Sequence, residues 1–153
     1  MTADEIINQL RELSDPAKIA DLERYAIKTP KWFGIRTPEL KAFAREVKKL
    51  VKDRHALAGE LWNSGIYDVQ AVAFMIDDPK IVTPEQMDSW AADFDNWATV
   101  DGACSYLFCR TPYAYDKAVE WAERIPEFEK RAAFSLMAYL AVHDKKASNA
   151  RLA

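Results

Sequence analysis

The sequence has few of the residues from which metal centres, disulfide frameworks and phosphate-binding loops are built. Only two histidines, two cysteines and four glycines occur in 153 residues, so we expect no metal cluster, no glycine-rich loop and no bound cofactor. Cys104 and Cys109 lie five residues apart within one helical stretch, which separates them around a helix and argues against a disulfide. No run of about 18 apolar residues is present, so we expect no membrane-spanning segment and no membrane partner.

A net positive charge is also absent. The formal charge is −3, from 21 basic and 24 acidic residues, whereas nucleic-acid-binding domains are usually basic. This charge balance argues against a protein whose whole surface attracts DNA. If the chain binds DNA, it needs a local basic face. The first residues, MTADE, are acidic and lack the apolar stretch of a signal peptide, so we expect a cytoplasmic protein.

Prolines and N-cap residues divide the chain into predicted helices. Asp15, Thr37, Thr83 and Thr111 each precede a proline, an order typical of an N-cap followed by the first helical residue. Gln86 completes a capping box with Thr83. Apolar residues recur at spacings of three and four, and no stretch alternates with period two. We predict one all-α domain over residues 1–153, with about eight helices near 3–13, 16–28, 38–51, 55–62, 66–76, 84–94, 96–109 and 113–143, the last broken around Pro126.

Two of these helices begin with similar residues. The segments 67–72 (YDVQAV) and 128–133 (FEKRAA) both open with an aromatic residue and an acid, followed after two variable positions by alanine. Small residues at these places let paired helices approach closely, as in stacked two-helix repeats of the HEAT type. The similarity favours a HEAT-like helical solenoid modestly over an irregular helical bundle.

The segment 94–108 carries the most informative polar residue. Asp101 lies four residues after Trp97 and three before Cys104, so it shares a helical face with an apolar stripe. We assign to that stripe Trp97, Val100, Cys104, Leu107 and Phe108. A carboxylate on such a face must be paired, hydrogen-bonded or open to a cleft. The sequence leaves open whether Asp101 is a structural carboxylate or a functional one.

Arg131 lies near the start of the second repeat-like helix, on a face with Phe128 and Ser135. Three roles are open to it: an ion pair with Asp101, a bidentate contact with a phosphate, or an exposed first-turn side chain. Most of the five tryptophans are expected to be packed between helices.

Five segments, in order along the chain, resemble the DNA alkylation repair family of AlkD-like DNA glycosylases. The likeness as a whole runs from about residue 20 to 147, and each segment is weak alone. The segments are 33–40 (FGIRTPEL), 61–67 (LWNSGIY), 95–101 (DNWATVD), 131–135 (RAAFS) and 141–146 (AVHDKK).

The resemblance implies a curved array of HEAT-like helix pairs that holds duplex DNA on its concave face. It implies hydrolysis of the N-glycosidic bond of N3- and N7-alkylated purines, without flipping the target base into a pocket. The family pattern maps the catalytic carboxylate onto Asp101, the sugar-contacting aromatic onto Trp97 and a DNA-contacting cation onto Arg131. Family members usually continue for several more helices, which bear a further functional tryptophan, whereas the resemblance in this sequence ends near residue 147. The alternative to a glycosylase is therefore a non-catalytic HEAT-repeat module that binds DNA or protein.

The last predicted helix is apolar on nearly every side between Ala132 and Val142. A terminal repeat normally needs a polar outer face. We therefore expect an exposed apolar patch along this helix, covered by a second copy of the chain, by further C-terminal residues or by a partner.

Overall fold

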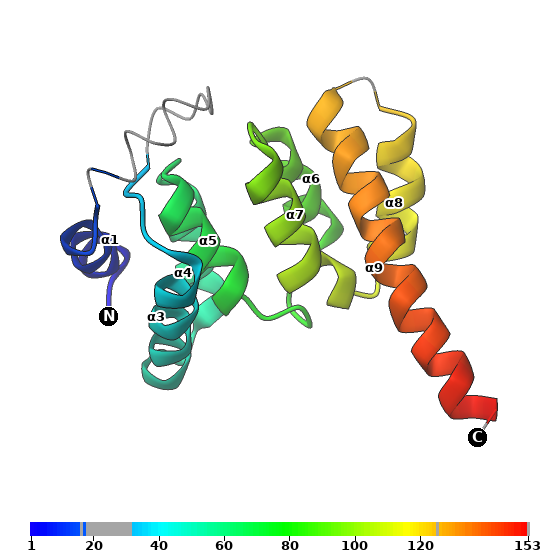
Figure 1. The fold of residues 1–153 in the computed structure, drawn as a ribbon, viewed down its shortest axis with the longest axis horizontal. Helices are drawn as coiled ribbons and strands as arrows, with labels where there is room; N and C mark the ends of the chain where they lie inside the picture. Colours follow the sequence, from blue (N-terminus) through cyan, green and yellow to red (C-terminus); the bar gives the residue numbers. More distant parts are fainter. Residues whose placement is uncertain (16, 18–31, 125, 153) are drawn as a thin grey trace. The chain divides into compact units, whose positions relative to one another are not determined.

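The computed structural model describes residues 1–15, 17, 32–124 and 126–152, and every regular element among them is helical. The helix predicted near 16–28 falls, apart from Ala17, outside the described residues. The elements are shown in Figure 1 and are α1 (Ala3–Glu12), α3 (Thr37–Leu50), α4 (Arg54–Trp62), α5 (Tyr67–Ile76), α6 (Pro84–Ala92), α7 (Trp97–Tyr106), the 3₁₀ turn η1 (Phe108–Arg110), α8 (Ala114–Ala122) and α9 (Glu127–Leu152). Most predicted helices correspond to these within a few residues, and the predicted break at Pro126 separates α8 from α9. The last helix is longer than predicted, because α9 continues to Leu152 and not only to residue 143.

The chain forms two compact units, Met1–Asp78 and Pro79–Ala153. In the first unit, α5 packs against α1, α3 and α4, and its residues from Asp68 to Ile76 are all buried. In the second unit, α9 packs against α6, α7, α8 and η1. Each unit is therefore built around one helix, and these two helices are the ones that open with the similar segments 67–72 and 128–133.

The helix starts confirm one predicted N-cap and correct two. The hydroxyl of Thr83 accepts a hydrogen bond from the Gln86 N–H at 3.1 Å, at the start of α6. Thr37, in contrast, lies inside α3, because the N-cap position belongs to Arg36 and the proline takes the second helical position. Thr111 does not cap α8 either: its hydroxyl donates to the Phe108 carbonyl at 2.8 Å, closing the turn before that helix begins.

A buried carboxylate fixes the start of α5. Asp68 is fully buried and accepts hydrogen bonds from the backbone N–H groups of Phe33 at 2.6 Å and Ile35 at 3.1 Å. Between them lies Gly34, whose φ of 74° is a left-handed conformation that favours glycine. Burial raises the pKa of Asp68, and the backbone N–H donors partly offset this rise.

The corresponding acid in the second unit, Glu129, is also buried. Its carboxylate accepts a hydrogen bond from the Arg124 guanidinium at 3.1 Å, joining the end of α8 to the first turn of α9. The shared acid of the two segments thus has a structural role in both units.

The two sides of α9 differ in burial although both are apolar. Ala132, Ala133, Leu136 and Leu140 are buried, whereas the outer side exposes 64% of Phe134, 40% of Met137 and 54% of Val142. The expected apolar patch on the last helix is therefore confirmed. We call Phe134, Met137 and Val142 the outer face of α9.

Removing the Asp68 carboxylate should weaken the first unit. In Asp68→Ala, two backbone N–H groups lose their acceptor, so we expect the free energy of unfolding to fall by about 2–3 kcal/mol at neutral pH. Denaturant unfolding measures this, with Asp4→Ala, an exposed first-turn acid of α1, as the control.

The pH dependence of this penalty follows from the raised pKa. A carboxyl whose folded-state pKa exceeds its unfolded value stabilises the fold most below the unfolded pKa, and this contribution is lost as pH rises through the folded-state pKa. The penalty of Asp68→Ala should therefore be larger below pH 3.8 than at neutral pH. A penalty that grows from acid to neutral pH would contradict this.

The outer face of α9 predicts self-association. Replacing its most exposed large side chain, in Phe134→Ser, should shift the protein toward monomer in sedimentation experiments, because apolar area buried between copies is lost. Val119→Ser removes an equally exposed apolar side chain on α8 and should leave the association unchanged. A wild-type protein that stays monomeric at all concentrations would refute the prediction.

Candidate functional site

The N-terminus of α7 sets the position of Trp97. The Asn96 side-chain carbonyl accepts a hydrogen bond from the Thr99 N–H at 2.8 Å, and its amide donates to the Thr99 hydroxyl at 2.9 Å. Both residues are buried, which fixes the first turn of the helix. Val100 and Cys104 then point into the core, but Trp97 is 57% exposed. The predicted apolar stripe is thus wrong at Trp97, which lies at the solvent edge of the helix and not on the buried face.

Arg131 joins Trp97 and Asp101 into one cluster. Its guanidinium donates to the Asp101 carboxylate from Nε at 3.3 Å and from an Nη atom at 3.0 Å. The same group lies over the Trp97 ring, 4.8 Å from its centroid. A planar guanidinium can form a two-pronged ion pair and a cation–π contact together. The three residues singled out in the sequence are therefore adjacent, and we call them the Trp97–Arg131–Asp101 cluster.

The cluster is open to solvent. The Asp101 and Arg131 side chains are 38% and 42% exposed. They line a shallow hollow of about 630 Å³, whose other walls are Phe134, Ser135, Ala138, Tyr139 and Val142 of α9. Ion pairs with this exposure stabilise a fold little, because water competes for both groups. Arg131 can therefore exchange Asp101 for another anion at low cost.

A partly buried polar network connects helices of the second unit. Asp88 of α6 accepts hydrogen bonds from Lys117 at 2.7 Å and from the Trp121 indole at 3.0 Å, both on α8. Arg124 donates to Asp88 and to Glu129, which connects α6, α8 and α9. Burial alone would raise the pKa of Asp88, but the bonds from Lys117 and Trp121 and the nearby positive charges lower it.

This network was not predicted from the sequence. The available signal was the spacing of Lys117 and Trp121, which places them on one face of α8, with Arg124 two residues after the end of that helix. The spacing does not show which acid these side chains contact, because Asp88 lies 29 to 36 residues earlier in the chain.

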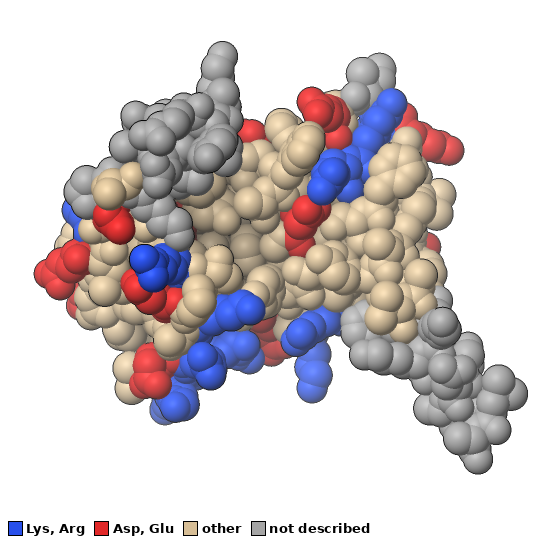
Figure 2. Space-filling view, in the orientation of Figure 1, with Lys and Arg blue, Asp and Glu red and all other residues tan. Residues whose placement is uncertain are grey.

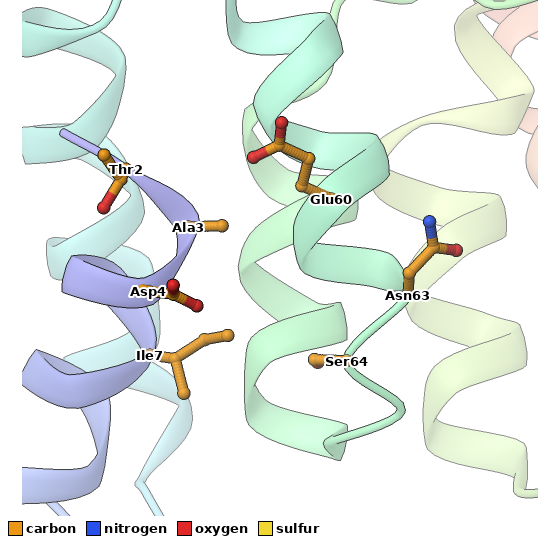
Figure 3. Close-up of a pocket in the computed structure, with 7 residues that line it drawn as sticks. All are labelled: Thr2, Ala3, Asp4, Ile7, Glu60, Asn63 and Ser64. Atoms are coloured by element: carbon orange, nitrogen blue, oxygen red, sulfur yellow. The ribbon is translucent and has the colours of Figure 1, made fainter.

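A second hollow, of about 400 Å³, lies between α1 and α4 in the first unit. Figure 3 shows Asp4 of α1 and Glu60 of α4 among the residues that line it; the others are Thr2, Ala3, Ile7, Asn63 and Ser64. With two carboxylates and no cation it is poorly suited to an anionic ligand. Across the described residues, no group of three or more histidine, cysteine or acidic side chains is placed to hold a metal ion.

The cysteines offer no nucleophile. Cys104 and Cys109 are both buried and free, as expected from their spacing. Burial raises the pKa of each thiol, so neither is ionised at neutral pH. Within the described part of the chain, no helix is long and apolar enough to cross a membrane.

Comparison with known proteins agrees with the fold and with the resemblance found in the sequence. A family model described as DNA alkylation repair enzyme matches residues 6–153. The chain is also similar to a solved structure described as a new family of proteins related to the HEAT-like repeat DNA glycosylases with affinity for branched DNA structures. That match has a TM-score of 0.79 and 23% identity, and it covers 92% of this chain and 57% of the other.

The chain thus spans a little over half the length of that protein. The predicted all-α, HEAT-like fold is confirmed by this match. No curated protein matches the chain.

Proposed function

Because this chain belongs to the DNA alkylation repair enzyme family, we propose that it is a DNA glycosylase that hydrolyses the N-glycosidic bond of N3- and N7-alkylated purines in duplex DNA. The observation that carries the proposal is the Trp97–Arg131–Asp101 cluster, an accessible carboxylate beside an exposed aromatic ring and a guanidinium. We take Asp101 and Trp97 as the catalytic residues and Arg131 as the DNA-contacting residue.

The proposed hydrolysis requires an ionised carboxylate near the sugar and does not require a strong general acid. An alkylated purine already carries positive charge, so it leaves with the bonding electrons when the bond to C1′ of the sugar breaks. The sugar then becomes oxocarbenium-like, as in glycoside hydrolysis. In the proposed mechanism the Asp101 carboxylate stabilises this cation, and water adds to C1′ and loses a proton to the carboxylate or to solvent.

Trp97 and Arg131 complete the proposed site. The Trp97 face already accepts a cation, since the Arg131 guanidinium lies over it, and the same face suits a cationic sugar. Arg131 has the planar fork that matches a phosphate. When it turns to a DNA phosphate, both the Asp101 carboxylate and the Trp97 ring become available to the sugar. Asp101 and Arg131 line an open hollow, which fits catalysis without a flipped base.

The proposal predicts that Asp101→Asn selectively lowers the rate of base release. Release of N7-methylguanine from methylated duplex DNA, measured under single-turnover conditions, should slow on the order of 100-fold, because the charge that stabilises the cationic sugar is lost. Asp116→Asn makes the same change at an exposed acid of α8 and should retain the wild-type rate. Equal release by wild type and Asp101→Asn would remove Asp101 from the mechanism.

A second candidate function is a non-catalytic module that binds DNA structure. It is favoured by the two-pronged ion pair, which occupies Asp101 in the free protein, and by the branched-DNA affinity described for the similar structure.

In this case wild type and Asp101→Asn should both release no alkylpurine. Both should bind a four-way DNA junction more tightly than a linear duplex of the same length in a gel-shift titration. Equal affinity for the two DNAs, together with alkylpurine release, would exclude this function.

A further inference from the structure

Basic residues are concentrated on and just after α3, in a chain that is acidic as a whole. Between residues 41 and 54 there are six basic and two acidic residues, a net charge of +4, whereas the complete chain carries −3. Figure 2 shows Lys and Arg side chains gathered over this part of the first unit. The charge is therefore segregated, and a local basic face exists.

The arrangement on α3 is a stripe. Lys41, Arg45 and Lys48 follow one another at intervals of four and three, so they lie along one side of the helix, and all three are exposed. Each lies one residue after the buried Leu40, Ala44 and Val47, which turns the stripe about 100° away from the core.

Within α3 the acids lie elsewhere. Glu39 and Glu46 fall on a different side of the helix from the stripe, and Glu46 pairs with Lys49 at 3.4 Å. The two carboxylates of the helix therefore lie off the stripe.

The length of the stripe matches a nucleic-acid strand. Seven residues of helix separate Lys41 from Lys48, a rise of about 10 Å. One strand of duplex DNA advances about 3.4 Å per phosphate along the axis, so three cations cover about three phosphate steps. Lys52, also exposed, adds a cation just after the C-terminal end of α3.

We propose that Lys41, Arg45 and Lys48 form a second DNA contact that binds the phosphate backbone of one strand without reading its sequence. This inference rests on the proposed function for its choice of DNA as the partner. The stripe lies on the first unit, whereas the Trp97–Arg131–Asp101 cluster lies on the second. The stripe supplies affinity and the cluster supplies chemistry.

The test compares two triple variants that change the charge equally. One carries Lys41→Gln, Arg45→Gln and Lys48→Gln. The control carries Arg36→Gln, Lys80→Gln and Lys130→Gln, three cations that are exposed and lie off the stripe. Binding to an unmodified 20-base-pair duplex is followed by fluorescence anisotropy at several salt concentrations, and thermal unfolding confirms that both variants are folded.

We expect the stripe variant to lose roughly tenfold or more in affinity and its salt slope, log K against log salt, to fall by about 2 to 3. The control should change far less. Equal losses in both variants, an unchanged stripe variant, or a wild type that does not bind DNA would overturn the proposal. So would a stripe variant that keeps its DNA affinity and loses only binding to vesicles containing phosphatidylserine.

The same proteins separate this inference from the proposed catalysis. With methylated duplex, the stripe variant should need more protein for half-maximal release of N7-methylguanine but keep the wild-type rate at saturation, the reverse of Asp101→Asn. If no protein releases the base and the stripe variant still loses DNA affinity, the catalytic proposal fails and the DNA contact stands.

Discussion

Whether Arg131 can contact Asp101 depends on the rotation of α9 about its own axis. Buried residues on the side of α9 opposite Arg131 fix that rotation. Glu129 is buried and held by Arg124, which also reaches Asp88. Two helical residues differ by about 200° in direction, so burying Glu129 turns Arg131 outward to the edge of α7. The position of the exposed cluster therefore depends on this partly buried network, in which the Glu129 side chain is 12% exposed. A buried carboxylate that lost its Arg124 partner would cost free energy, which favours this rotation of α9.

Local sequence signals predicted the helices and the residues of the cluster, but not how those residues are exposed. Helical periodicity placed Asp101 and Trp97 on one side of a helix, and pairing of Asp101 with Arg131 was one of three possibilities. Trp97 was assigned to one apolar stripe with Val100 and Cys104, because spacing alone does not show that the Asn96 N-cap leaves Trp97 at the solvent edge of the helix. The partner of Lys117 was missed for a different reason: Asp88 is distant in sequence, and only folding brings it near.

Net charge was a poor guide to local electrostatics in this chain. Charges in physiological salt are screened over about 8–10 Å, which is close to the length of the stripe on α3. In the proposed contact, a phosphate strand against Lys41, Arg45 and Lys48 would interact most strongly with those cations. The acids farther away would act at longer range, where they would slow association with DNA at low salt. An acidic sequence and a DNA-binding surface are thus compatible when the cations share one helix face.

In the proposed mechanism, the ion pair at the cluster links DNA binding to catalysis. Asp101 would act on a sugar only after Arg131 leaves it, and a DNA phosphate would give Arg131 an equivalent bidentate partner. DNA binding would then both position the substrate and free the carboxylate, whereas without DNA the ion pair occupies the carboxylate. The outer face of α9 adds a constraint, because Phe134 and Val142 line the same hollow as Asp101 and Arg131. A second copy of the chain seated on that face would cover Asp101 and Arg131, so the predicted self-association through α9 and the proposed action on DNA at Asp101 would exclude each other.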